Sequence, residues 1–269
     1  MSAAGPGVKL AALLCYATAL AGAGALAARV FLLGLGLLPA ASDPPDVRSW
    51  LLDLGWLAAF GLQHSGMARA RFKRRLSRLV PPRLERSLYA AAAGLVLLGL
   101  ALTWRPLGGG VIWAGPAWLA VVPLAAGAGL AAINLRFDHA GLFGLRQVWE
   151  GEPAPEELLV LGPYRYVRHP LMACLLVMVW AQPVMTATLA VLSGGLTAYV
   201  ALGLVFEERD LLRRFGPAYA AYRRRVPALV PWRPPAEPAR YPATEPQPRR
   251  GEIGQPGATP RGEETGSPR

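Results

Sequence analysis

The side chains best suited to chemistry stand together in one short segment, residues 162–170. The segment opens with a Gly-Pro turn, and its last position, Pro170, can begin a helix. Between them, Tyr164 offers a ring face and a hydroxyl, Arg168 can pair with a carboxylate, and His169 follows directly. This set suits a cofactor that carries a carboxylate and an aromatic base. The alternative is an interfacial anchor, in which tyrosines and arginines mark the headgroup level of a membrane.

A second group of ionisable side chains follows a long apolar stretch. Glu207 and Glu208 end this stretch, and Tyr219 comes shortly after them. If the stretch folds back on itself, its two ends meet, and the carboxylates face Arg168 and His169. An ionisable residue at a membrane boundary is a functional candidate by default. The alternative is a charged helix end exposed to water.

The three histidines are further candidates. His64, His139 and His169 all lie at or near the ends of apolar stretches rather than within them. Histidine can act as a base, a hydrogen-bond donor or a metal ligand. No cysteine accompanies the histidines, and no pair has a spacing such as His-x-x-x-His. The sequence therefore predicts no metal site.

The elements that position these residues are expected to lie in a membrane. Hydrophobic residues make up 53% of the 269-residue chain and charged residues 17%, which is too apolar for an ordinary soluble domain. The first apolar block exceeds the roughly 20 residues that cross a bilayer, and it is too long for a cleaved signal peptide. The apolar blocks cover residues 8–38, 50–62, 88–104, 113–133 and 171–206.

The last apolar block is long enough for two crossings. Gln182, Pro183 and Thr186 interrupt it near its middle, which is typical of a tight reversal between antiparallel helices. The expected fold class is therefore all-α. We expect a polytopic membrane helix bundle of about six transmembrane helices, of which the last two form a helical hairpin.

The positions of Lys and Arg predict the orientation. Residues 66–86 contain eight of them, whereas residues 39–47 contain none. Because basic loops remain in the cytoplasm, both termini are expected there, in a bacterial inner membrane. This distribution accounts for the net charge of +11 without a nucleic-acid partner.

The C-terminal segment differs in composition from the rest of the chain. From Arg233 onward it is rich in Pro, Gly, Glu and Arg and nearly free of large aliphatic residues. Such a segment cannot bury enough apolar surface to offset the entropy lost on ordering. We therefore expect a membrane-embedded domain over residues 1–232 and a disordered cytoplasmic tail over residues 233–269.

The segment Arg168-His169-Pro170, the following apolar stretch and Glu207-Glu208 together resemble the signature of a known family. This family is the isoprenylcysteine carboxyl methyltransferase type of integral-membrane methyltransferases. The resemblance implies an S-adenosylmethionine site on the cytoplasmic side of the membrane. By motif match, its residues are Tyr164, Arg168, His169, Pro170, Glu207 and Glu208.

A closer resemblance lies outside that signature. Residues 60–69 and 134–149 are similar to the bacterial methanethiol S-methyltransferases, and the similarity covers roughly residues 51–232. It implies methylation of a small thiol, methanethiol, to dimethyl sulfide. The chain departs from the pattern at Met172, where these families usually have tyrosine.

Methyl transfer from a sulfonium to sulfur is an in-line displacement. The protein has to align the two partners, exclude water and keep the nucleophile as a thiolate. His64 and His139 are the candidate bases, and Arg146 is a candidate electrostatic helper. Two alternatives stay open: a methyltransferase for a larger lipidic or prenylcysteine acceptor, and a non-catalytic membrane protein linked to nitrogen-oxide respiration.

Overall fold

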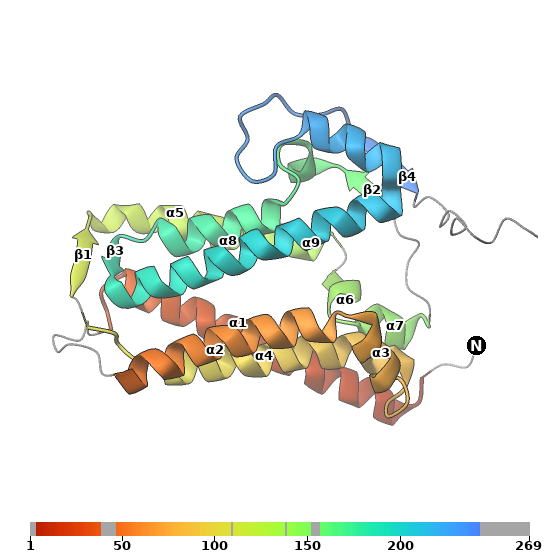
Figure 1. The fold of residues 1–269 in the computed structure, drawn as a ribbon, viewed down its shortest axis with the longest axis horizontal. Helices are drawn as coiled ribbons and strands as arrows, with labels where there is room; N and C mark the ends of the chain where they lie inside the picture. Colours follow the sequence, from red (N-terminus) through yellow and green to blue (C-terminus); the bar gives the residue numbers. More distant parts are fainter. Residues whose placement is uncertain (1–3, 39–46, 109, 138, 152–156, 243–269) are drawn as a thin grey trace, which may run out of the picture.

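The protein is a bundle of long helices that run along a common axis (Figure 1). The computed structural model describes residues 4–38, 47–108, 110–137, 139–151 and 157–242. Within these residues, four helices are long and apolar enough to cross a membrane. They are α1 (Pro6–Gly34), α4 (Glu85–Thr103) with the short helix before it, α5 (Val121–Arg136) with the short helix before it, and α9 (Ala187–Arg225). The prediction of a mostly helical, multi-pass membrane protein is confirmed in this form.

The other helices complete two layers. Figure 1 shows α1, α2 (Val47–Met67) and α4 in one layer, and α5, α8 (Pro170–Trp180) and α9 in the other. Short helices connect the longer ones or extend them. They are α3 (Ala70–Leu76), η1 (Pro82–Leu84), η2 (Ala117–Ala120), α6 (His139–Leu142), α7 (Leu145–Trp149) and η3 (Gly162–Arg165).

Helices α1 and α4 approach each other closely because glycines face one another. A Cβ atom built on Gly22 would lie 1.9 Å from the carbonyl oxygen of Gly94, so no larger residue fits at this crossing. Small residues allow membrane helices to pack backbone against backbone, since lipid provides no hydrophobic drive for their association. Helices α1 and α4 therefore pack closely within the first layer.

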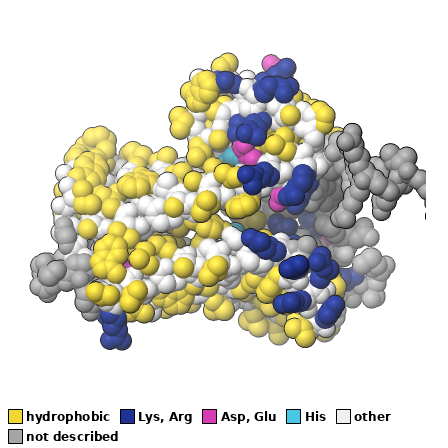
Figure 2. Space-filling view, viewed as in Figure 1, with side chains coloured by type: hydrophobic (Ala, Val, Ile, Leu, Met, Phe, Trp, Pro, Cys, Tyr) yellow, Lys and Arg dark blue, Asp and Glu magenta, His cyan; other side chains and the backbone are white. Residues whose placement is uncertain are grey.

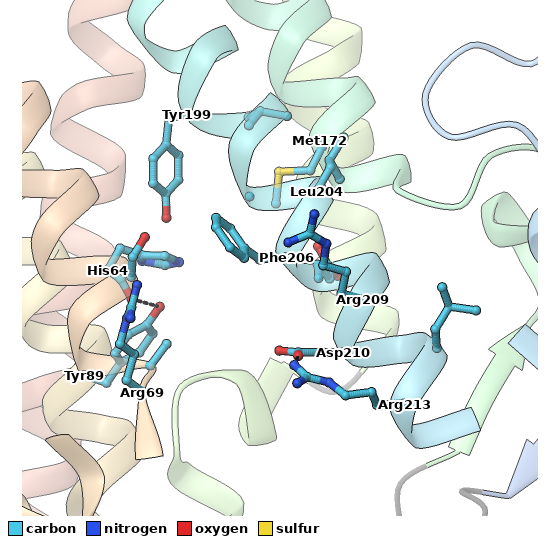
Figure 3. A pocket seen from close by; sticks show the side chains of 16 residues that line it. His64, Arg69, Tyr89, Met172, Tyr199, Leu204, Phe206, Arg209, Asp210 and Arg213 are labelled. Atoms are coloured by element: carbon cyan, nitrogen blue, oxygen red, sulfur yellow. Dashed lines mark hydrogen bonds and ion pairs between the residues drawn. The ribbon is translucent and has the colours of Figure 1, made fainter. Parts of the chain in front are cut away.

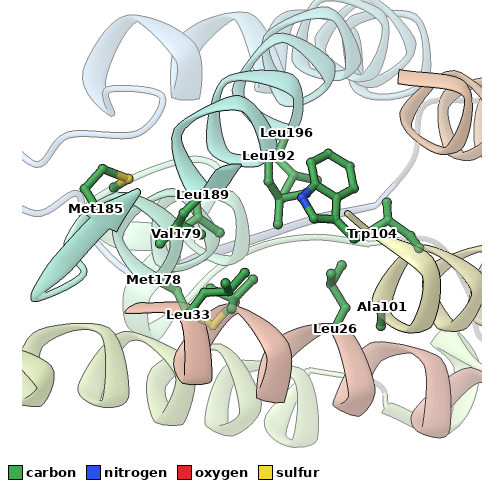
Figure 4. Close-up of a cluster of buried hydrophobic side chains, with 12 residues drawn as sticks. Leu26, Leu33, Ala101, Trp104, Met178, Val179, Met185, Leu189, Leu192 and Leu196 are labelled. Carbon is green, nitrogen blue, oxygen red and sulfur yellow. The ribbon is translucent and has the colours of Figure 1, made fainter. Parts of the chain in front are cut away.

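The main apolar core lies where the two layers meet, toward one end of the bundle (Figure 4). Its members come from α1, α4 and the residue after it, α8, β3 and α9. They are Leu26, Val30, Leu33, Leu100, Ala101, Trp104, Met178, Val179, Met185, Leu189, Leu192 and Leu196. All of them lie near the connection between α8 and α9. The polar residues predicted to form the site lie toward the opposite end of the bundle.

Two short antiparallel ribbons were not predicted from the sequence. At the core end, β1 (Val111–Ala114) pairs with β3 (Val184–Thr186), which lies between α8 and α9. At the opposite end, β2 (Glu157–Val160) pairs with β4 (Ala239–Pro242). Their strands have three or four residues, and each finds its partner far away in sequence, so no local pattern indicates them.

The second ribbon corrects the predicted start of the disordered tail. Residues 233–242 are placed against the domain, although the tail was expected to begin at Arg233. Ala236 and Arg165 exchange two hydrogen bonds: the Ala236 amide donates to the Arg165 carbonyl, and Arg165 Nε donates to the Ala236 carbonyl. The composition argument fails here because backbone pairing needs no large aliphatic side chains. Residues 243–269 of the predicted tail lie outside the described residues.

A glycine inside α9 changes the direction of the chain. Gly216 has φ 49° and ψ −124°, which side-chain-bearing residues rarely adopt, and Pro217 follows it. The helix therefore breaks, and its last part returns over the β2–β4 ribbon, as Figure 1 shows. A second apolar core fixes this returning part. It consists of Leu158, Val160, Phe215, Tyr219, Tyr222 and Val226.

Candidate active site

The segment that directly follows α9 holds the start of α8 in place. The backbone amide of Arg168 donates to the Pro227 carbonyl at 2.9 Å, and that of His169 donates to the Ala228 carbonyl at 3.0 Å. Pro170 then begins α8, a position where its missing amide costs no helical hydrogen bond. The Arg-His-Pro segment is thus fixed from both sides before any side chain contributes.

The guanidinium of Arg168 binds the carboxylate of Glu208. Arg168 Nε lies 2.9 Å from Glu208 Oε1, and Arg168 Nη2 donates to the same oxygen. The Arg168 side chain is 9% exposed and that of Glu208 13%, so water screens this pair poorly. Arg168 Nη1 also donates to the carbonyls of Val226 and Arg223, which ties the pair to the chain after the Gly216 break.

Two more cationic or protonatable groups surround the Glu208 carboxylate. Arg223 Nε lies 3.2 Å from its Oε2 atom, and His169 Nε2 lies 3.3 Å from its Oε1 atom. Both oxygens of Glu208 therefore have partners within the protein. Glu207 differs, because its side chain is 51% exposed and its Oε2 atom lies 3.6 Å from His169 Nδ1. Glu207 is the carboxylate that a cationic ligand can reach.

Tyr164 lies beside this charged cluster. Its carbonyl accepts a hydrogen bond from the Tyr222 hydroxyl at 2.7 Å, and its ring meets the Phe137 ring edge to face at 5.1 Å. Burial and, secondly, the negative charge of Glu207 raise the pKa of the Tyr164 hydroxyl above its usual value. Tyr164 is therefore a neutral donor at physiological pH.

A large cavity lies between the two layers next to this cluster (Figure 3). Its volume is about 1120 Å³. His64 of α2 and Tyr89 of α4 line one side, and Met172 of α8 and Glu207 of α9 line the other. Figure 2 shows Lys and Arg side chains gathered at this end of the molecule, over α3 and the C-terminal part of α9.

His64 contributes an imidazole set among aromatic rings. Its ring stacks on Phe60 with centroids 5.3 Å apart, and the rings of Tyr89 and Tyr199 lie 5.0 and 5.9 Å away. Nδ1 of His64 is buried and has no hydrogen-bond partner among the described residues. Nε2 is therefore the nitrogen left to meet a ligand, and Figure 3 shows the imidazole reaching toward the middle of the cavity.

His139 and Arg146, the other two residues predicted to act on the thiol, lie elsewhere. His139 Nδ1 is 2.5 Å from Asn134 Oδ1, and its Nε2 is 2.8 Å from the Tyr16 hydroxyl. Arg146 Nε lies 3.6 Å from Glu150 Oε2, one helical turn away. Neither His139 nor Arg146 lines the cavity. The structure thus brings His64 and Glu207 to one cavity, and it places His139 and Arg146 outside the cavity wall.

Some residues of the site were not singled out from the sequence. Tyr89 and Tyr199 line the cavity beside His64, and Arg223 pairs with Glu208. Tyr89 and Tyr199 could have been found from the sequence, because each places a hydroxyl inside an otherwise apolar stretch. Arg223 was hidden in a run of three arginines, because only the break at Gly216 determines which of them turns inward. The described residues contain no cluster of three or more His, Cys, Asp or Glu side chains placed to hold a metal ion.

Comparison with known proteins gives the family. A methanethiol S-methyltransferase of Mycobacterium tuberculosis is 41% identical over 201 residues, which cover 70% of the chain and 80% of that protein. Methanethiol S-methyltransferase 2 of Bradyrhizobium diazoefficiens is 40% identical over 193 residues, or 67% of the chain and 73% of that protein. Nurim of Homo sapiens is 32% identical over 206 residues, or 66% of the chain and 78% of that protein.

No protein-family model matches the chain, and no solved structure matches it either. In the relatives at 40% and 41% identity, the matched segment covers most of the relative's length, so the similarity is not confined to one motif. The chain belongs to the methanethiol S-methyltransferase family.

Proposed function

We propose that the chain transfers a methyl group from S-adenosylmethionine to methanethiol and releases dimethyl sulfide. The observation that carries this proposal is the cavity that His64 and Glu207 share. It places a candidate base and a reachable carboxylate on facing walls of one space. Two relatives that bear the name of this activity are 40% and 41% identical to the chain.

The signature residues suit the cofactor in two different ways. Glu207 lines the cavity and is reachable, so it would hold a cationic group or ribose hydroxyls, and the neutral hydroxyl of Tyr164 can donate beside it. Arg168, His169 and Glu208 bind one another and do not line the cavity, so they would shape the site rather than contact the cofactor directly. Pro170 sets the start of α8. When bound, the cofactor supplies a methyl group on a positively charged sulfur.

On the acceptor side we assign the base to His64. A thiol in the cavity can give its proton to Nε2 of His64, because Nδ1 is buried away from the ligand space. The surrounding aromatic rings exclude water, which favours reaction of the thiolate that remains. The contacts of His139 with Tyr16 and Asn134 suit a structural role, and Arg146 receives no role toward the acceptor.

The membrane arrangement completes the proposal. We infer six spans, because α2 and α8 lie alongside the four long apolar helices (Figure 1). α8 has 11 residues and alone covers about half of the roughly 30 Å hydrocarbon layer, so residues 181–186 would complete its crossing before α9 returns as the second arm of a hairpin. The gathering of Lys and Arg at the site end favours a cytoplasmic site with both termini on that side. A membrane domain would then be followed by a cytoplasmic tail after Pro242.

The test of the function uses membranes that contain the full chain. They are incubated with S-adenosylmethionine labelled in its methyl group and with methanethiol, and volatile products are trapped. We expect labelled dimethyl sulfide, and much less of it from membranes that carry Arg168→Ala when the cofactor concentration is limiting. Label in a lipidic or prenylcysteine product instead would favour the larger acceptor, and no transfer to any acceptor would favour a non-catalytic protein.

A further inference from the structure

The cavity is much larger than the proposed acceptor requires. Its volume of about 1120 Å³ exceeds the range of roughly 300 to 1,000 Å³ that holds a drug-sized ligand. Methanethiol has two heavy atoms, and one water molecule takes up about 30 Å³ of liquid. The acceptor part of the cavity therefore has room for more than a single methyl group, even with a cofactor beside it.

The two ends of the cavity differ in chemistry. Glu207, Arg209 and Asp210 supply charged groups at one end. Near the candidate base the wall is mostly aromatic: Tyr89 and Tyr199 lie beside His64, together with one charged residue, Arg69. A thiol whose sulfur approaches the base would place its carbon substituent against this aromatic wall. Burial of apolar surface there would add affinity with each methylene group, about fourfold at most.

One glycine in this wall leaves space for a larger substituent. Gly203 lines the cavity and lies four residues after Tyr199 on α9, so the two are neighbours on the same helix face. A Cβ atom built on Gly203 would meet no heavy atom within 4 Å. A side chain at this position would therefore extend into open space rather than into a neighbouring helix.

We infer, on the basis of the proposed function, that the site methylates alkyl and aryl thiols larger than methanethiol, and that Gly203 sets the size limit. In this step the thiol proton passes to His64, and the thiolate sulfur forms a bond to the methyl carbon. The bond from that carbon to the sulfonium breaks, and its electron pair stays on the cofactor sulfur. The products are a methyl thioether and the demethylated cofactor, whose sulfur is now an uncharged thioether.

The experiment compares methanethiol, ethanethiol, 1-butanethiol and benzenethiol as acceptors for the purified full chain, with labelled S-adenosylmethionine. We expect the wild-type chain to methylate all four. Gly203→Leu should lower the ratio of kcat/KM for benzenethiol to that for methanethiol at least about tenfold, the scale on which pockets discriminate by size. Gly203→Ala should give an intermediate ratio, which keeps the test open if the leucine variant fails to fold.

Gly194→Leu is the matched control. Gly194 lies on the same helix, a Cβ atom there also meets nothing within 4 Å, and the residue does not line the cavity. In Gly194→Leu, the ratio of kcat/KM for benzenethiol to that for methanethiol should equal the wild-type ratio. Methylation of methanethiol alone by the wild-type chain would overturn the inference and leave the proposed function standing. No transfer to any of the four thiols would overturn the proposed function itself. An unchanged ratio in both Gly203 variants would remove Gly203 as the size limit.

Discussion

Arg168 Nε lies 2.9 Å from Glu208 Oε1, across 40 residues of chain that run along the bundle and back. The pair joins the segment just before α8 to the polar part of α9. Arg223 binds the other oxygen of Glu208, so the segment after the Gly216 break is held by the same carboxylate. The geometry of the candidate cofactor site therefore depends on one buried ion cluster and one glycine.

The first prediction concerns Gly216. Gly216→Ala should lower both the thermal stability of the chain and its affinity for S-adenosylmethionine, because a Cβ atom at φ 49° and ψ −124° costs about 1 to 3 kcal/mol. The measurements are thermal unfolding in detergent and equilibrium binding of the labelled cofactor. Gly194→Ala is the control, since alanine improves a regular helix. Equal cofactor affinity in the two variants would contradict a role for the break.

The second prediction concerns the end of the chain. A chain that ends at Pro242 should keep methyl transfer within about twofold, because all described contacts of the tail remain. A chain that ends at Pro235 loses β4 and both hydrogen bonds between Ala236 and Arg165. At about 1 kcal/mol for each bond, its cofactor affinity should fall at least about fivefold. If both truncated chains behave alike, the β2–β4 ribbon does not support the site.

The two histidines outside the signature should respond differently to substitution. His64→Gln should lower kcat about 100- to 10,000-fold and leave the affinity for S-adenosylmethionine near that of the wild-type chain, as expected for loss of a general base. His139→Gln removes contacts with Tyr16 and Asn134, so it should mainly lower thermal stability, by about 1 kcal/mol. Turnover and cofactor binding are measured on the same preparations. A larger fall of kcat in His139→Gln than in His64→Gln would reverse the assignment.

The membrane arrangement is tested with reporter fusions. Reporters after Leu38 and within residues 105–112 should report the periplasm, whereas those after Met67 and after Pro242 should report the cytoplasm. The eight basic residues between positions 66 and 86 are the physical reason for this orientation. A periplasmic signal after Met67 would place the candidate site on the wrong side of the membrane for S-adenosylmethionine supplied from the cytoplasm.

Features that depend on the type and period of residues could be predicted from the sequence. The apolar block over residues 171–206 breaks where Gln182 and Pro183 predict a reversal, since α8 ends at Trp180 and α9 begins at Ala187. The sequence also led us to expect that Arg168 meets Glu208, and the two side chains form an ion pair.

Features that depend on contacts between distant residues could not be predicted in this way. The pairing of β4 with β2 joins segments about 80 residues apart through backbone atoms, which carry no sequence signal. The choice of His64 over His139 depends on which helices enclose the cavity, and both residues have the same sequence context at the end of an apolar stretch. The role of Arg223 depends on the single backbone conformation at Gly216.

The ion pair between Arg168 and Glu208 is tested most directly by equilibrium binding of labelled S-adenosylmethionine to purified variants. Glu208→Gln leaves the buried guanidinium of Arg168 without its carboxylate, and Arg168→Ala takes from Glu208 its most buried cationic partner, so each should lower affinity at least about tenfold while membrane insertion is unchanged. Lys73→Ala breaks an exposed ion pair with Glu85 and should bind the cofactor as the wild-type chain does. Wild-type affinity in both Arg168→Ala and Glu208→Gln would contradict the account, and the Arg-His-Pro segment would then be an interfacial anchor.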